Sequence, residues 1–256
     1  MGQDMKMSTA FDDLIAEMDH IVEDCRSAQS RAGYFAALYR NVTRELRRQS
    51  ESGAFPDPTR MVEFTSIFAH RYLDAYSAWR SGRATTAAWS AAFSATDRWR
   101  PIVLQHLLLG MNAHINLDLG VVGAELGDRY GLDEIGGDFH ALNDLLSSMI
   151  LRSQQAVDSV SPWIGLLDRL GGRNDTTVVR FSLIRAREAA WHSAQRLSPM
   201  SSDDRAAAVD ELDANIQRLS RVVAPGPFLL SGAMLLVRFR ERRSVRDVID
   251  ALSTVG

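Results

Sequence analysis

Residues 105–125 read QHLLLGMNAHINLDLGVVGAE, a mostly apolar run that five polar side chains interrupt: His106, Asn112, His114, Asn116 and Asp118. On an α-helix, His106, His114 and Asp118 share one stripe, because they are separated by multiples of four residues. Apolar residues surround that stripe, and a helix that is apolar nearly all round is normally buried. Buried polar groups need hydrogen-bond partners. The sequence therefore predicts a central helix that carries an acid, two imidazoles and two amides inward.

The rest of the chain is also predicted to be helical. Alternating β-branched runs are missing, and Gly and Pro fall between long segments with an apolar period of 3.6 residues. We expect these helices at about 9–30, 34–51, 57–81, 85–97, 101–119, 137–159, 176–197 and 201–223, with shorter ones after 227. The predicted fold class is all-α: a single-domain bundle (1–256) of about nine or ten helices around the buried central helix (about 101–119), with 1–8 as a flexible tail.

Particular residues mark the expected ends of these helices. Asp57 followed by Pro58 has the character of a helix start, and Ser244 with Asp247 has the spacing of a capping box. The glycines at 120, 123 and 127 predict that the central helix ends there, and DRYGLDEIGG (128–137) is expected to be a loop. Further breaks are expected at 171–175 and at 225–227.

Composition narrows the classes of protein. The 256 residues are 46% hydrophobic with a net charge of −3, which gives no reason to expect nucleic acid or an anionic membrane as a partner. A single cysteine, Cys25, excludes an internal disulfide and a cysteine-built metal site. The N-terminus has no apolar signal core and no apolar run has the length of a membrane span, so we expect a cytoplasmic protein without a transmembrane segment. Lys6 is the only lysine beside many arginines, as is typical of a GC-rich bacterial genome.

The histidines fall into a repeated pattern. Four of the six have an aspartate four residues later: His20/Asp24, His70/Asp74, His114/Asp118 and His140/Asp144. Residues i and i+4 project from one helix face, so such a pair can bind a metal ion or form a general-base dyad. It can equally be a surface ion pair or a buried histidine with its structural partner. His114/Asp118 is the strongest candidate because its helix is so apolar, and His70/Asp74 is next because an aromatic-rich helix carries it.

Three segments carry a resemblance: QHLLLGMNAHINLDLG (105–120), RYLDAYSAW (71–79) and DFHALNDLL (138–146). They resemble an uncharacterised bacterial all-helical family, a domain of unknown function with an H-I-N-x-D-L core. REAAWHSAQRL (187–197) fits the C-terminal half of that family, and the likeness covers most of residues 10–220. The resemblance implies a single helical domain and draws attention to His114, Asn116 and Asp118. It implies no activity.

These patterns favour an enzyme that acts on a small, largely apolar molecule in a pocket of the bundle. The expected catalytic residues are His114, Asp118, His70 and Asp74, and the expected substrate-orienting residues are Asn112, Asn116 and Tyr72. The reaction could use a metal-free acid–base dyad, or a divalent metal (zinc, iron or manganese) on His106, His114 and Asp118, as in a metal-dependent hydrolase.

Two other functions remain open. One is a non-catalytic helical protein that binds an apolar ligand or a partner helix, with structural His/Asp pairs. The other is a homodimer built on the apolar segment 228–239.

Overall fold

The computed structural model describes residues 2–161, 175–224, 231–241 and 244–254, and within these ranges the chain forms helices and loops with no β-strand. The α-helices are, in chain order, α1 (Gly2–Ser27), α2 (Gly33–Glu51), α3 (Pro58–Arg80), α4 (Ala87–Thr96), α5 (Val103–Ala113), α6 (Leu119–Tyr130), α7 (Leu132–Val160), α9 (Asp175–Leu197), α10 (Ser202–Val223), α11 (Ser231–Arg240) and α12 (Val245–Ser253). The predicted all-α bundle is confirmed.

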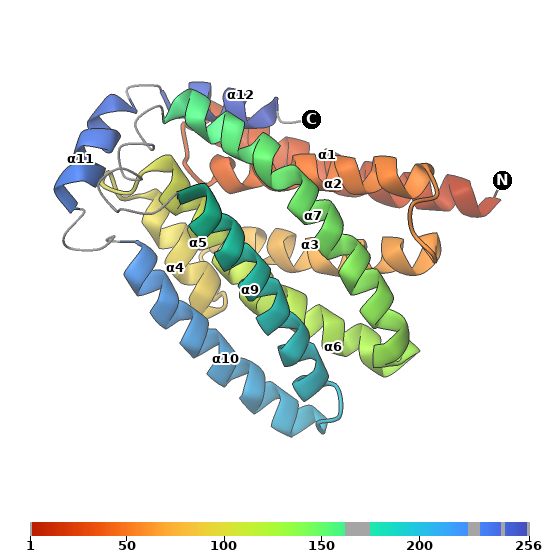
Figure 1. The fold of residues 1–256 in the computed structure, drawn as a ribbon. Coiled ribbons are helices and arrows are strands. Elements are labelled where there is room, and N and C mark those ends of the chain that lie inside the picture. The colour runs from red at the N-terminus through yellow and green to blue at the C-terminus, as the bar shows by residue number, and fades with distance from the viewer. Residues whose placement is uncertain (1, 162–174, 225–230, 242–243, 255–256) are drawn as a thin grey trace.

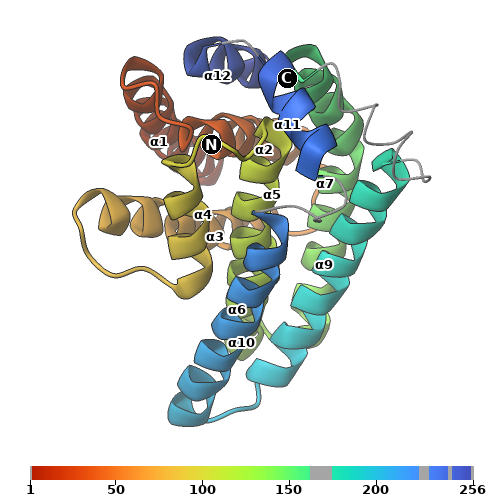
Figure 2. The same ribbon diagram turned by 90° about the vertical axis from the view of Figure 1, so that its left-hand side faces the viewer.

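The central helix is longer than predicted. α5 and α6 form one continuous helix because a π-helical segment, His114–Asp118, joins them. This helix contacts α2, α3, α4, α7, α9 and α10, and Figures 1 and 2 show those helices arranged around it. Val103–Tyr130 has the length and apolar composition that could cross a membrane, but 78% of its apolar window is buried inside the protein. A buried core helix has the same composition.

The expected end of the central helix near its glycines is wrong, because those glycines serve helix packing. A Cβ atom added to Gly120 would lie 3.1 Å from the carbonyl oxygen of Ala190, and one on Gly123 would lie 2.9 Å from the Cβ of Ala194. The absence of side chains therefore allows α9 to approach α6 closely. The helix ends only at Gly131, which has a φ of +88°, and the expected loop at 128–137 is reduced to this residue between α6 and α7.

Two helix starts predicted from capping residues are confirmed, whereas α1 and α7 begin earlier than predicted, at Gly2 and Leu132. The Asp57 side chain accepts a hydrogen bond from the Arg60 backbone N–H at 2.9 Å, with Pro58 at the first helical position. Ser244 and Asp247 form the predicted capping box, each accepting from the other's backbone N–H.

Some expectations fall at the edges of the described residues. Residues 2–8, expected to be a flexible tail, belong to α1. Of the predicted breaks at 171–175 and 225–227, residues 171–174 and 225–227 lie outside the described residues, and Asp175 begins α9. In the apolar segment 228–239, residues 228–230 are not described, Leu236 and Phe239 are exposed, and Val237 is fully buried.

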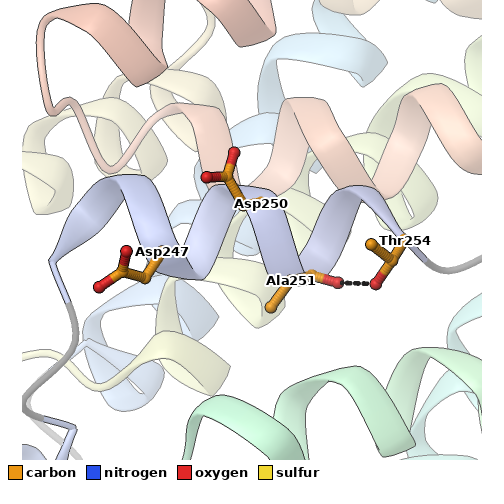
Figure 3. A pocket seen from close by; sticks show the side chains of 4 residues that line it. All are labelled: Asp247, Asp250, Ala251 and Thr254. Atoms are coloured by element: carbon orange, nitrogen blue, oxygen red, sulfur yellow. Dashed lines mark hydrogen bonds between the residues drawn. The ribbon is translucent and has the colours of Figure 1, made fainter.

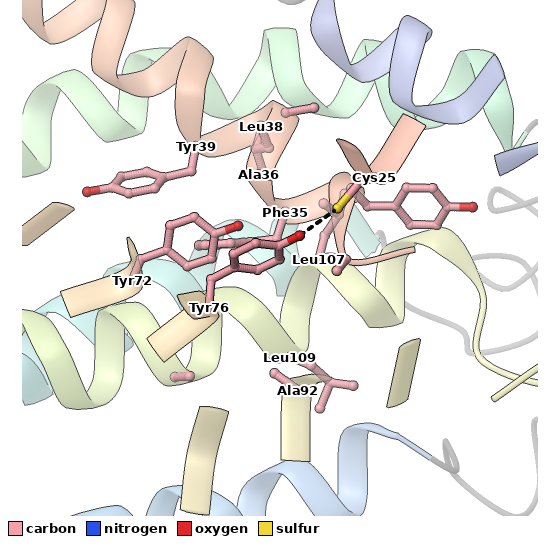
Figure 4. Packing of buried hydrophobic residues seen from close by; sticks show 14 of the residues in the cluster. Cys25, Phe35, Ala36, Leu38, Tyr39, Tyr72, Tyr76, Ala92, Leu107 and Leu109 are labelled. Atoms are coloured by element: carbon pink, nitrogen blue, oxygen red, sulfur yellow. Dashed lines mark hydrogen bonds between the residues drawn. The ribbon is translucent and has the colours of Figure 1, made fainter. Parts of the chain in front are cut away.

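An aromatic core packs against one side of the central helix. Rings from α2, α3 and α4 contact one another there, and Figure 4 shows several of them together. Tyr39, Tyr72 and Trp89 belong to this group, and each is at most 4% exposed. These rings cover the part of the central helix that carries His114.

Candidate functional site

The predicted His114/Asp118 pair lies deep in the protein. The two residues begin and end the π-helical segment, and their exposed fractions are 3% and 1%. His114 Nδ1 lies 3.1 Å from Asp118 Oδ2. Short π-helical segments within α-helices are rare and occur often at functional sites.

Two further donors bind the Asp118 carboxylate. Trp89 on α4 donates its indole N–H to Oδ2 at 2.9 Å, and Arg71 on α3 donates its Nε–H to Oδ1 at 2.9 Å. Because Arg71 supplies a positive charge, Asp118 is a carboxylate that accepts from all three partners. The geometry therefore places the imidazole proton of neutral His114 on Nδ1, which leaves a lone pair on Nε2.

Aromatic rings enclose the imidazole. The Phe68 ring stacks on His114 with 3.7 Å between ring centroids, and the Tyr39 ring meets it edge-on at 4.5 Å. The rings of Phe35, Tyr72 and Trp89 lie within 6.4 Å. Burial lowers the pKa of His114, and the Asp118 hydrogen bond opposes this only in part. His114 is therefore neutral at pH 7 and stays neutral below the usual histidine pKa.

Several buried polar atoms around this site have no hydrogen-bond partner in the described part of the chain. They are His114 Nε2 and the hydroxyls of Tyr39 and Tyr72. Figure 4 shows the Tyr72 hydroxyl on the side of Tyr76 and Cys25, whereas the Tyr39 hydroxyl points the opposite way. Buried polar groups are nearly always paired, so a group of unpaired ones needs an explanation.

His70 and Asp74 do not join the site. Both side chains are exposed, and His70 Nδ1 contacts the carbonyl oxygen of Ser66, one turn earlier, at 2.8 Å. The inward face of α3 is instead formed by Phe64, Phe68, Tyr72 and Tyr76, which follow one another at intervals of four. The expected catalytic pair His70/Asp74 lies beside that face.

The other His/acid pairs are also at the surface. His20, Asp24, His140 and Asp144 are all exposed, and so are Glu188 and His192, which are four residues apart on α9. Of the spaced pairs, only His114/Asp118 is buried.

His106 lies apart from His114, although both are on the central helix. A Cβ on Gly110, halfway between them, would lie 2.5 Å from the Phe35 ring, so that ring fills the intervening space. His106 instead meets Tyr34, and burial together with Arg31 and Arg238 lowers its pKa to about 3. The described residues contain no group of three His, Cys, Asp or Glu side chains that could hold a metal ion. The expected set of His106, His114 and Asp118 is therefore not brought together.

Of the two expected substrate-orienting amides, Asn112 binds a neighbouring helix and Asn116 binds Asn112. Asn112 donates to the carbonyl oxygen of Ile216 and to Ser220 Oγ on α10, at 3.1 and 3.0 Å. Asn116 donates to Asn112 Oδ1 at 2.8 Å. Asn112 thus fixes α10 against the central helix, and the hydrogen bonds of both amides leave them no visible part in the His114 site. Tyr72, the third expected orienting residue, does lie in the aromatic core beside His114.

Sequence reasoning missed four contributors to the site: Tyr39, Phe68, Arg71 and Trp89. Their types are common in cores and on surfaces, and no spacing relates them to His114. For Arg71 there was one signal, its position at the start of the segment RYLDAYSAW (71–79) that carried the family resemblance.

A shallow depression lies on α12, away from this site. Asp247, Asp250, Ala251 and Thr254 line it (Figure 3). Both carboxylates already have partners, since Asp247 caps its own helix and Asp250 pairs with Arg26 at 2.7 Å. This depression therefore offers no free functional group for binding.

Comparisons with known proteins agree with the resemblance of the sequence to an uncharacterised family. Neither a search of curated proteins nor a search of solved structures finds a match. The family model described as "Family of unknown function (DUF5995)" matches residues 11–225, which include the His114–Asp118 segment and all of its aromatic neighbours. The chain belongs to this family of unknown function, DUF5995.

Proposed function

We propose that the protein is an enzyme in which His114 acts as a general base on a small, largely apolar substrate. The observation that carries the proposal is the missing hydrogen-bond partner of one atom, His114 Nε2, within the described part of the chain. His114 Nε2 is buried among aromatic rings without a partner in the described residues, while Nδ1 of the same ring lies against Asp118. His106 also has unpaired ring nitrogens in the described residues, but His114 differs because its other nitrogen lies against a carboxylate, as in a general-base dyad.

The residues around His114 suit proton abstraction. A proton taken by Nε2 creates an imidazolium, which the Asp118 carboxylate stabilises through Nδ1–H. Arg71 and Trp89 fix the carboxylate, so the ring keeps its orientation as the charge forms. Because burial lowers the His114 pKa, the base is in its active, neutral form at pH 7.

The surroundings also suggest the kind of substrate and its route. The rings of Phe35, Phe68 and Trp89, which pack around His114, favour an apolar or aromatic molecule. The Arg71 side chain is 29% exposed although the Asp118 side chain that it binds is 1% exposed. A displacement of Arg71 would thus connect the dyad with solvent. We place substrate entry at Arg71.

A probe of general-base activity tests the proposal without knowledge of the substrate. 5-Nitrobenzisoxazole is small, aromatic and uncharged, and removal of its C3 proton breaks the N–O bond and gives a coloured phenolate. We expect the protein to accelerate this opening and His114→Gln to reduce the rate by about 10²–10⁴-fold, as for loss of a positioned base. His70→Gln is the matched control, because His70 also has an aspartate four residues later but is exposed.

The pH profile gives a second readout. Activity that depends on His114 should persist below pH 6.5, because the base has a lowered pKa. Equal rates for His114→Gln and the wild type would contradict the proposal. Tight probe binding without turnover would instead favour the non-catalytic alternative, an apolar-ligand protein.

A further inference from the structure

The Tyr39 hydroxyl is a buried group without a structural role in the described residues. It is fully buried and has no hydrogen-bond partner there. The Tyr39 ring lies 4.5 Å from the His114 ring and 6.1 Å from the Phe68 ring, measured between centroids. A hydroxyl deprived of water and of a protein partner destabilises the fold, so an unpaired hydroxyl on a ring that packs against the general base calls for a functional reason.

The neighbouring tyrosines provide a comparison. The Tyr76 hydroxyl lies 3.3 Å from Cys25 Sγ and so has a partner. The Tyr72 hydroxyl lies on that same side, whereas the Tyr39 hydroxyl points away from it (Figure 4). Burial and the nearby Asp118 charge raise the pKa of Tyr39 well above its usual value. Tyr39 therefore keeps its proton and can act only as a neutral donor or acceptor.

We infer that the Tyr39 hydroxyl donates a hydrogen bond to a carbonyl oxygen of the substrate while His114 Nε2 removes a proton from the adjacent carbon. This inference rests on the proposed general-base function and names its substrate class: a small, apolar carbonyl compound with a C–H bond next to the carbonyl. A neutral donor in an apolar site stabilises the charge that develops on such an oxygen.

The reaction step balances without a further reactant. The α-carbon loses a proton to His114 Nε2, and the C–H electron pair forms the C=C bond of an enolate. The carbonyl π electrons move to the oxygen, which accepts the Tyr39 hydrogen bond. Asp118 stabilises the imidazolium, and return of the proton from Nε2 to carbon restores the ketone or its isomer.

Hydrogen exchange at carbon tests the inference directly. Acetophenone in D₂O is followed by proton NMR, which reports loss of its methyl signal as deuterium enters. We expect the protein to accelerate this exchange and Tyr39→Phe to slow it by about 10²–10³-fold, the usual effect of removing one donor to an oxyanion. Tyr76→Phe, which removes a hydroxyl with a partner in the same core, should leave the rate unchanged.

Thermal stability separates a functional from a structural hydroxyl. Tyr39→Phe should keep or raise the Tm, because it removes an unpaired buried group, whereas Tyr76→Phe should lower it. A fall in the Tm of Tyr39→Phe as large as that of Tyr76→Phe, or failure of this variant to fold, would overturn the inference. So would an exchange rate that Tyr39→Phe does not change.

The inference and the proposed function fail in different ways. Opening of 5-nitrobenzisoxazole that requires His114, without any exchange of acetophenone, overturns the carbonyl inference and leaves the general base in place. If His114→Gln affects neither reaction, the general base itself is wrong and the inference falls with it.

Discussion

Three donors converge on the carboxylate of Asp118, and this arrangement should make it important for stability. In Asp118→Asn, an amide N–H replaces one carboxylate oxygen and faces a donor, either Arg71 or the pair Trp89 and His114. The variant also leaves the Arg71 charge without its partner. We expect a loss of roughly 3 kcal/mol in the free energy of unfolding, moderated because Arg71 is partly exposed. Urea denaturation at pH 7 measures it. Asp74→Asn, at the exposed pair, should change stability by less than about 0.5 kcal/mol.

His106 should make the stability of the protein depend on pH. Its folded-state pKa of about 3 lies below the usual 6.5, so the unfolded chain binds one more proton between these values. Stability is then complete above pH 6.5 and falls as the pH is lowered towards 3, by about 1.4 kcal/mol per pH unit. His106→Leu should remove this part of the slope, which urea denaturation at pH 7 and pH 5 can detect.

The sequence led to His114 and Asp118 because a polar pair in an apolar helix must be buried with partners. The same spacing gave the wrong orientation for His70 and Asp74. α3 carries aromatic residues at 64, 68, 72 and 76, and this apolar stripe decides which way the helix faces. Because large aromatic rings are buried in preference to charged side chains, this stripe predicts that His70 lies on the outer face of α3. Tyr39, Phe68 and Trp89 could not have been assigned, because their contacts with His114 exist only after four elements have packed.

The glycines of α6 should act through packing between helices. A Cβ at Gly123 would meet the Cβ of Ala194 at 2.9 Å and push α9 away from α6. We expect Gly123→Ala to destabilise the protein by about 1–3 kcal/mol. Gly137→Ala in α7 has no atom within 4 Å of the new Cβ, so it should stabilise the protein by about 0.4–1 kcal/mol. Denaturation curves for both variants test the opposite signs, and a stabilised Gly123→Ala would show that α9 is not held by this contact.

Helix starts were easier to predict than helix ends or helix geometry. Asp57, Ser201 and Ser244 cap their helices through local hydrogen bonds that sequence spacing alone specifies. Glycine has two uses, to end a helix or to let another helix approach, and the sequence does not distinguish them. The π-helical segment at His114–Asp118 is likewise invisible in the sequence. Its wider turn is maintained by the tertiary contacts of His114 and Asp118.

The C-terminal helix α12 belongs to the same core, although the family match ends at residue 225. Asn41 on α2 donates to the carbonyl oxygen of Leu252 at 2.8 Å, and the fully buried Ile249 packs beside Gly33 and Cys25. Because Cys25 is only 2% exposed and burial raises its pKa, its thiol should react very slowly with alkylating reagents while α12 is in place.

Truncating the Ile249 side chain should therefore expose Cys25 to solvent. Ile249→Ala leaves a cavity beside the thiol and should lower the free energy of unfolding by about 2–5 kcal/mol. Labelling of Cys25 by iodoacetamide in native conditions should become faster, because local opening of α12 costs less in this variant. Arg246→Ala, on the exposed face of the same helix, is the control and should label at the wild-type rate. Equal labelling of all three proteins would mean that Cys25 is protected by α1 and α2 alone, and that α12 adds nothing to the closure of the core.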